Sequence, residues 1–261
     1  MRKTLFMLFA MALPALAWAA ATVQTVSGDV RVETAGKQVA LGANQRVDSG
    51  ATVHTGTNGR VMLRFDDGQM TALNPDTSFR VDEYRFDAAK PEAGSVTVSL
   101  LKGALRMVTG LIGARSPERF AMKTPTATIG IRGTDFMAAT GSLYLSVQQG
   151  LVTASTSAGS LGFAAGQLGF VAGPAVVPAS IAASQLPAGI ASSFSQLGGL
   201  SMAGAGAASG AGASGATGAA AGGGIGAGAV AAGAIAAGVV AGAASDKTGT
   251  TSTTSTSGTA P

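Results

Sequence analysis

The sequence predicts an all-β fold, and three observations support that prediction. Apolar and polar residues alternate in short runs, and glycine-based turn signals recur about every eight to twelve residues. Between these turns no segment has a convincing helical periodicity. The pattern extends from about Val23 to Val171 and is typical of a β-sandwich, a β-barrel or a β-solenoid, and it excludes a parallel α/β sheet.

The chain begins with the layout of a cleavable signal peptide. Arg2 and Lys3 precede an apolar run from Leu5 to Leu16, which is shorter than the roughly 20 residues that a membrane-spanning helix needs. Small residues follow, so we expect cleavage after Ala19 or Ala21, with an uncleaved anchor as the alternative. The predicted location is therefore outside the cytoplasm, either periplasmic or secreted.

A hairpin and three further strands can be placed within the β region. Val61, Leu63 and Phe65 alternate with polar neighbours, and residues 66–68, Asp-Asp-Gly, then supply a tight turn. The same alternation predicts strands over residues 79–82, 96–100 and 143–147, and longer loops over residues 90–92 and 110–118.

Composition divides the remainder of the chain. The predicted boundaries are a signal peptide over residues 1–21, a β domain over 22–172, a proline-containing linker over 173–202, a Gly/Ala-rich apolar segment over 203–245 and a Thr/Ser-rich tail over 246–261.

Residues 225–244, inside the Gly/Ala-rich segment, have the length of a membrane span. Alanine and glycine contribute little transfer energy, however, and each glycine weakens a helix by about 1 kcal/mol relative to alanine. Three interpretations stay open, namely a flexible low-complexity linker, membrane association and self-association through close packing of small residues.

Charge is distributed unevenly along the chain. No Lys, Arg, Asp or Glu occurs between Phe136 and Ser245, so this half has little electrostatic protection against self-association. The formal charge of +4 falls by two when Arg2 and Lys3 are removed, and basic and acidic residues are interspersed, which argues against nucleic-acid binding. Cysteine is absent, so no disulfide stabilises the fold.

No pattern in the sequence predicts an enzyme, a metal site or a cofactor. His54 is the only histidine and no nucleophile-elbow sequence accompanies it, so we interpret it as an ordinary strand or turn residue. The acidic pairs Asp66-Asp67 and Asp82-Glu83 fit a solvated turn and a strand end better than acid/base catalysis.

One segment combines polar residues with a bend. Arg132-Gly133-Thr134-Asp135 interrupts an apolar alternation that resumes at Phe136, and Gly133 permits a backbone conformation closed to other residues. Arg132 and Asp135 are expected to pair across the turn, with a partner-contact role for Arg132 as the alternative.

The same segment resembles the signature of the FecR domain family, in which Thr124, Pro125 and Ala127 lead to an Arg-Gly-Thr-Asp-Phe turn. The candidate signature and partner-contact residues are Thr124, Pro125, Arg132, Gly133, Thr134, Asp135 and Phe136. Further family-like segments lie at residues 28–30, 50–56, 63–68, 74–77 and 102–105, so the resemblance covers about Val23 to Val152.

The resemblance implies an extracytoplasmic, twisted, solenoid-like β domain. Well-known members of the family are inner-membrane regulators that relay a signal from an outer-membrane iron-siderophore transporter to a cytoplasmic sigma factor. In this chain a signal peptide leads directly into the domain, so the expected function is a non-enzymatic binding or scaffold module of the bacterial envelope that contacts a protein or glycan. A FecR-type signalling regulator without the usual cytoplasmic segment is the alternative.

Overall fold

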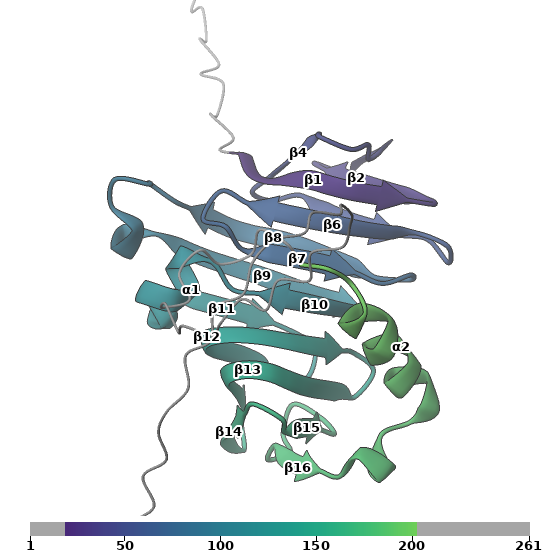
Figure 1. The fold of residues 1–261 in the computed structure, drawn as a ribbon, viewed down its shortest axis with the longest axis vertical. Helices are drawn as coiled ribbons and strands as arrows, with labels where there is room; N and C mark the ends of the chain where they lie inside the picture. The colour runs from purple at the N-terminus through teal and green to yellow at the C-terminus, as the bar shows by residue number, and fades with distance from the viewer. Residues whose placement is uncertain (1–18, 203–261) are drawn as a thin grey trace, which may run out of the picture. The chain divides into compact units, whose positions relative to one another are not determined.

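The computed structural model describes residues 19–202, and these residues form an all-β fold (Figure 1). They build one sheet of sixteen strands, in which β9 and β11 pair in parallel and the other neighbours pair antiparallel. The sheet curls back on itself, so that two walls face each other across a shared core. This arrangement confirms the predicted fold class.

Within each wall the strands lie side by side, in an order that runs from the N-terminal to the C-terminal part of the domain. The first wall contains β4 (Arg46–Asp48), β1 (Ala19–Ser27), β6 (Arg60–Phe65), β7 (Met70–Leu73) and β10 (Ala104–Val108). The second wall contains β3 (Lys37–Ala40), β2 (Val30–Thr34), β5 (Thr52–Thr55), β8 (Ser78–Arg85), β9 (Ser95–Lys102) and β11 (Phe120–Lys123).

Two long strands join the walls, because each of them bends from one wall to the other. They are β12 (Thr128–Ala139) and β13 (Leu143–Thr156), which pair with each other along almost their whole length. The sheet then ends in β14 (Gly159–Ala164) on the second wall and in β15 (Leu168–Val171) and β16 (Ala179–Ile181) on the first.

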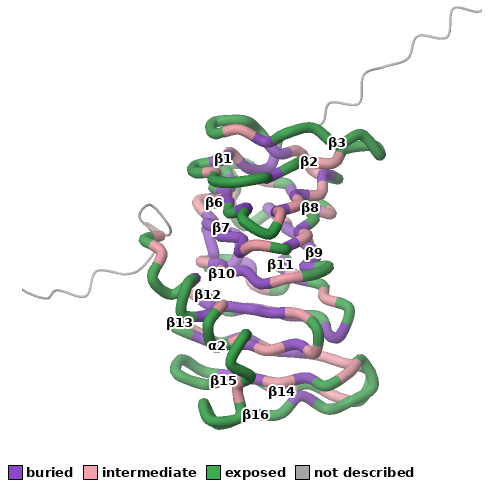
Figure 2. Tube along the Cα trace, turned by 90° about the vertical axis from the view of Figure 1, so that its right-hand side faces the viewer, coloured by how far each residue is buried: buried purple, intermediate pink, exposed green. Residues whose placement is uncertain are grey.

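One hydrophobic core fills the space between the walls (Figure 2). The predicted hairpin forms as expected, since β6 pairs antiparallel with β7 and buries Val61, Leu63 and Phe65 while Arg60 and Arg64 are exposed. Each fully buried side chain of this size stabilises the fold by roughly 1.5–3 kcal/mol. Alternation of this kind therefore supplies the stability that a chain without disulfides needs.

A second, smaller core lies on the outer face of the first wall. There α2 (Ala188–Gly198) buries Phe194 and Leu197 against Ala72, Ala104 and other small or apolar side chains of the wall. Strand β7 is consequently buried on both faces.

Residues 173–202, expected as a linker, are thus structured. They contain β16, a short 3-10 helix (Ala183–Gln185) and α2. The predicted loops also contain short helices, namely 3-10 turns at Pro91–Ala93 and Pro117–Arg119 and α1 (Leu111–Arg115).

Residues 1–18 and 203–261 lie outside the described residues, and with them most of the predicted signal peptide and the stretch 225–244. Within residues 19–202, no helix has the length and apolar character that crossing a membrane requires.

Candidate functional site

The first half of the signature segment forms a tight turn between β11 and β12. The hydroxyl of Thr124 accepts hydrogen bonds from the N–H groups of Thr126 (3.2 Å) and Ala127 (2.9 Å) and donates one to the carbonyl of Ala127 (2.8 Å). Pro125 adds rigidity because its ring fixes one backbone angle. This turn holds β12 beside β11.

The second half of the signature is the corner at which β12 passes from the second wall to the first. The β12–β13 register shifts between Arg132 and Phe136, which marks a β-bulge, and Gly133 has a φ of 57°. The corner of β13 lies directly against it, at Gly150 with a φ of 80°. A β-carbon on Gly150 would lie 2.1 Å from the carbonyl oxygen of Gly133, so only glycine allows this approach.

The buried residue Thr134 pins the corner to the end of β10. Its N–H group donates to the hydroxyl of Thr109 (2.9 Å), and that hydroxyl donates to the carbonyl of Thr134 (3.2 Å). Phe136, the last residue of the signature, is fully buried in the main core. Thr134 and Phe136 therefore hold the corner in place and pack it onto the core.

The expected pairing of Arg132 with Asp135 is wrong. The carboxylate of Asp135 pairs with Arg106 of the neighbouring strand β10 through two hydrogen bonds, of 2.9 and 2.7 Å. Both side chains are only about 15% exposed, and the hydrogen bonds that Arg106 donates to Asp135 raise the pKa of Arg106. Within residues 19–202 the exposed side chain of Arg132 has no ion pair or hydrogen bond. The bend turns Arg132 away from Asp135, which explains the difference.

Arg106 connects the signature to α2. Its Nη1 donates to the carbonyl oxygens of Leu197, Gly198 and Leu200, at 3.1 to 3.2 Å, at and just beyond the C-terminal end of α2, where a helix leaves carbonyls without partners in its own hydrogen-bond ladder. A cation at a helix C-terminus also interacts favourably with the helix dipole. Because Asp135 holds the side chain of Arg106 and Arg106 binds the C-terminal end of α2, these contacts fix the position of α2 on the wall.

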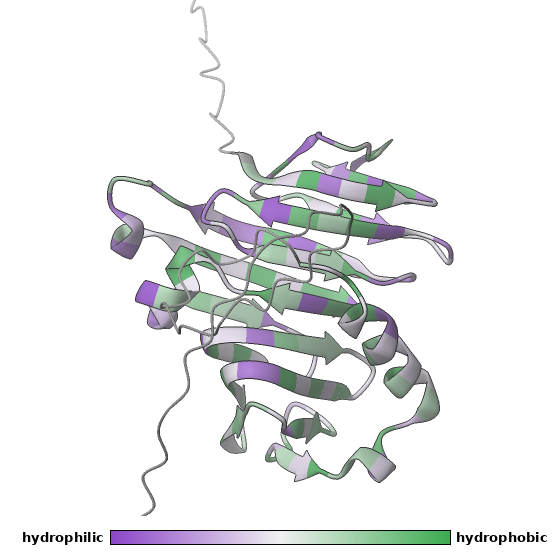
Figure 3. Cartoon of the chain, viewed as in Figure 1, coloured by the Kyte–Doolittle hydropathy of each residue, from purple (hydrophilic) through white to green (hydrophobic). Residues whose placement is uncertain are grey.

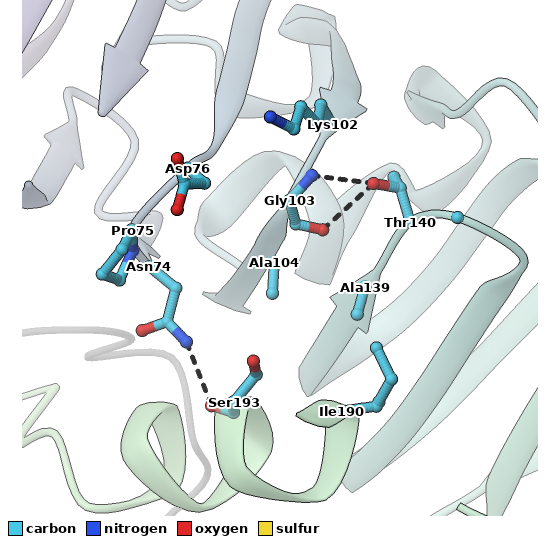
Figure 4. Close-up of a pocket in the computed structure, with 11 residues that line it drawn as sticks. Asn74, Pro75, Asp76, Lys102, Gly103, Ala104, Ala139, Thr140, Ile190 and Ser193 are labelled. Carbon is cyan, nitrogen blue, oxygen red and sulfur yellow. Dashed lines mark hydrogen bonds between the residues drawn. The ribbon is translucent and has the colours of Figure 1, made fainter. Parts of the chain in front are cut away.

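A pocket of about 330 Å³ lies between α2 and two loops (Figure 4). The β7–β8 loop supplies Asn74, Pro75 and Asp76, and the β9–β10 connection supplies residues 102–104. Both loops belong to segments that resemble the FecR family, so the fold brings two separate family-like segments to one place.

Hydrogen bonds hold the walls of this pocket in place. The N–H of Gly103 donates to the hydroxyl of Thr140 (2.7 Å), and the side-chain amide of Asn74 donates to the carbonyl of Ser193 on α2 (3.2 Å). Asp76 and Lys102 stand on the side away from α2, exposed, and no ion pair involving them occurs in the described part of the chain (Figure 4). A small fixed pocket with two available charges suits the binding of a polar group.

His54 lies between two potential partners on the outer face of the second wall. Its Nδ1 is 3.0 Å from the hydroxyl of Ser78, and its Nε2 is 3.4 Å from the carboxylate of Glu33. No local sequence pattern predicts this arrangement, since the three residues lie on separate strands. It resembles a proton relay, but the backbone groups of β2, β5 and β8 are engaged in strand pairing and cannot serve as oxyanion donors.

Metal ligation finds no support in the described residues, where no three His, Cys, Asp or Glu side chains cluster.

The acidic pair Asp66-Asp67 is not simply a solvated turn. Asp66 pairs with Arg46 at the surface (2.9 Å), whereas Asp67 is 3% exposed.

Comparisons with known proteins give a family match and similar solved structures. Residues 51–153 match the family model described as FecR protein. No curated protein matches the chain. Two crystal structures of "a putative anti-sigma factor from Parabacteroides distasonis ATCC 8503" have TM-scores of 0.40 and 0.41, with 15% identity over 50% of this chain. The matched part spans 58% of those chains.

Proposed function

Since residues 51–153 of this chain are a FecR domain, we propose that the protein is a FecR-type regulator that works outside the cytoplasm by binding another protein. The family match is the observation that carries the proposal. It extends from β5 into β13 and includes the whole signature as well as both loops that line the pocket. This evidence favours the signalling role over the general scaffold role that the sequence favoured.

The pocket beside α2 is the contact surface that we propose for the partner. Its rim carries one carboxylate, Asp76, and one ammonium group, Lys102, which can each form a charge-assisted hydrogen bond with a partner side chain. Its loops are already ordered by the hydrogen bonds of Gly103 and Asn74, so a partner would meet a surface that costs little to organise.

The predicted signal peptide supports a location in the periplasm or beyond. Signal transfer from there requires a partner that reaches the membrane, which is why the proposal places protein binding, and no reaction, at the centre.

The test is a transcript comparison in the native organism. Deletion of the gene should change a small set of transcripts, and the wild-type gene should restore them. Complementation with the double variant Asp76→Lys/Lys102→Glu should fail, because both rim charges are reversed while the core is untouched. Lys37→Glu, a charge reversal on the exposed strand β3, is the matched control and should restore the transcripts.

Unchanged transcripts after deletion would remove the regulator proposal. In that case the scaffold role becomes the better candidate, and one observation favours it. The surface from Phe136 to Met202 carries no charge at all, which suits broad contact with another polypeptide.

A further inference from the structure

The C-terminal end of the sheet presents an open strand edge. Within residues 19–202, β14 pairs with β13 alone and β16 pairs with β15 alone, so each has one side without a strand neighbour (Figure 1). Unpaired backbone N–H and C=O groups along such an edge can bind a further strand, and soluble proteins usually block this with charges, prolines or bulges.

The N-terminal end of the same sheet has such protection. Its edge strand β3 contains Lys37, and the opposite edge strand β4 is three residues long and contains Arg46 and Asp48. At the C-terminal end no charged residue follows Asp135 within the described chain, and strongly hydrophilic colour is sparse over β14 to β16 (Figure 3). One chain thus protects one end of its sheet and leaves the other open.

Strand β14 is well suited to pairing. Its sequence, Gly-Ser-Leu-Gly-Phe-Ala, contains neither charge nor proline, and all six residues pair with β13 in an unbroken register. No bulge interrupts this pairing. At its end Ala164 is already engaged by Gln167, because its N–H donates to the side-chain oxygen of Gln167 (2.7 Å) and its carbonyl accepts the N–H of Gln167 (3.0 Å), so the free part of the edge is residues 159–163.

Exposed apolar side chains lie close to β14, with Leu151 on the paired strand β13 and Val176 and Val177 beside the β13–β14 turn. Leu151, Val176 and Val177 are 39%, 47% and 55% exposed. A β-carbon built on Gly162 would contact Leu151 at 3.6 Å, and one built on Gly159 would contact Val177 at 3.8 Å. Burial of these side chains would add hydrophobic free energy to the backbone pairing.

We propose that β14 is the pairing edge of a symmetric dimer, in which it lies antiparallel to β14 of a second copy. When a two-fold axis relates the two copies, the backbone N–H and C=O groups of β14 in one copy can pair with those of the antiparallel β14 in the other. The uncharged end meets an identical uncharged end without repulsion, whereas a charged partner would find no opposite charge there. This dimer goes beyond the proposed regulatory function and does not depend on it.

The test is sedimentation of the full exported chain over a range of concentrations. The wild-type chain should shift from monomer to dimer. Ser160→Lys/Gly162→Lys places like charges on both copies beside the axis and should weaken dimerisation by roughly tenfold or more. Val39→Lys is the matched control, because it puts a lysine on the edge strand at the other end, where Val39 is 48% exposed, and should dimerise like the wild type.

Amide hydrogen exchange of the wild-type chain gives a second measurement that needs no variant. The amides of β14 should become more protected as concentration rises, while those of β3 should not change. A wild-type chain that stays monomeric, or a double variant that associates as strongly as the wild type, would overturn the proposal. If the chain associates through residues 203–245 instead, the double variant should associate as strongly as the wild type, and the amide protection of β14 should not change with concentration.

Discussion

Asp67 lies in the β6–β7 turn with its carboxyl group buried beside α1. Its Oδ1 accepts the N–H of Gln69 (3.1 Å) and the hydroxyl of Tyr84 (3.3 Å), and its Oδ2 accepts the N–H of Ile112 (3.3 Å). Burial raises the pKa of Asp67 above 3.8 more than these hydrogen bonds lower it. Burial, together with the neighbouring Asp67, also raises the pKa of Tyr84.

This buried carboxyl should make the domain less stable as pH rises. Between 3.8 and the raised pKa the folded chain binds the proton more tightly than the unfolded chain, so the free energy of unfolding falls across that window. Each tenfold difference in proton affinity contributes about 1.4 kcal/mol. Asp67→Asn should remove this dependence in urea unfolding curves at several pH values. Asp66→Asn, one residue away, should retain it, and identical profiles for both variants would contradict the assignment.

Three glycines of β12 and β13 should respond to alanine in a graded order. Gly150→Ala combines a φ of 80° with a contact of 2.1 Å to backbone, so we expect a loss of about 3 kcal/mol or more. Gly133→Ala meets no atom within 4 Å but keeps a φ of 57°, so about 1 kcal/mol should be lost. Gly130→Ala has open space and no positive φ, and should be neutral or slightly stabilising. Thermal unfolding measures all three, and equal losses would contradict the corner geometry.

At the scale of elements, β1 decides between the two predicted cleavage sites. Both Ala17-Trp18-Ala19 and Ala19-Ala20-Ala21 fit the small-residue rule for signal peptidase. Ala20 and Ala21 are fully buried, and Ala21 pairs with Phe65 of β6. Cleavage after Ala19 therefore leaves this part of the strand intact.

We predict that the mature chain begins at Ala20. Intact-mass measurement or N-terminal sequencing of the exported protein tests this directly. A start at Thr22 would mean that the first residues of β1 are dispensable, and a chain that retains Met1 would contradict signal-peptide cleavage. Loss of Trp18, the only tryptophan, should also remove indole fluorescence from the mature protein.

The elements divide into those that the sequence predicts and those that it does not. Alternation predicts the β6–β7 hairpin because β6 has one exposed face and one buried face. The helix α2 was missed although Ile190, Phe194 and Leu197 have helical spacing, because three apolar residues among Ala, Gly and Ser make a weak signal and nearby prolines suggest a linker. Its stability comes from the wall beneath it, which no local pattern shows.

The candidate site divides in the same way. The signature Gly133 was correctly expected to adopt a backbone conformation that favours glycine, since that property is local. The partner of Asp135 was not predictable, because Arg106 lies 29 residues away in the sequence and only strand pairing brings the two together. The pocket depends likewise on loops that meet α2 from distant parts of the chain.

At the scale of the whole domain, the continuous core between the walls distinguishes this fold from a simple array of repeats. In such arrays each unit contacts only its neighbours, and distant units can unfold separately. Here one continuous cluster of buried side chains extends from Ala20 in β1 to Val171 in β15, and β12 and β13 each contribute to both walls. Strands at opposite ends of the domain therefore share the same core.

We expect residues 20–202 to unfold in one cooperative transition. Leu63→Ala in β6 and Phe163→Ala in β14, both fully buried, should lower the same transition, by about 2–5 and about 3–5 kcal/mol. Val177→Ala, at a side chain that is 55% exposed, should change it by less than about 0.5 kcal/mol. Guanidinium unfolding followed by circular dichroism and by the fluorescence of Tyr84 and Tyr144 provides the measurement. Because Tyr84 lies in β8 and Tyr144 in β13, two separate transitions at the two probes would show that the walls do not fold as one unit.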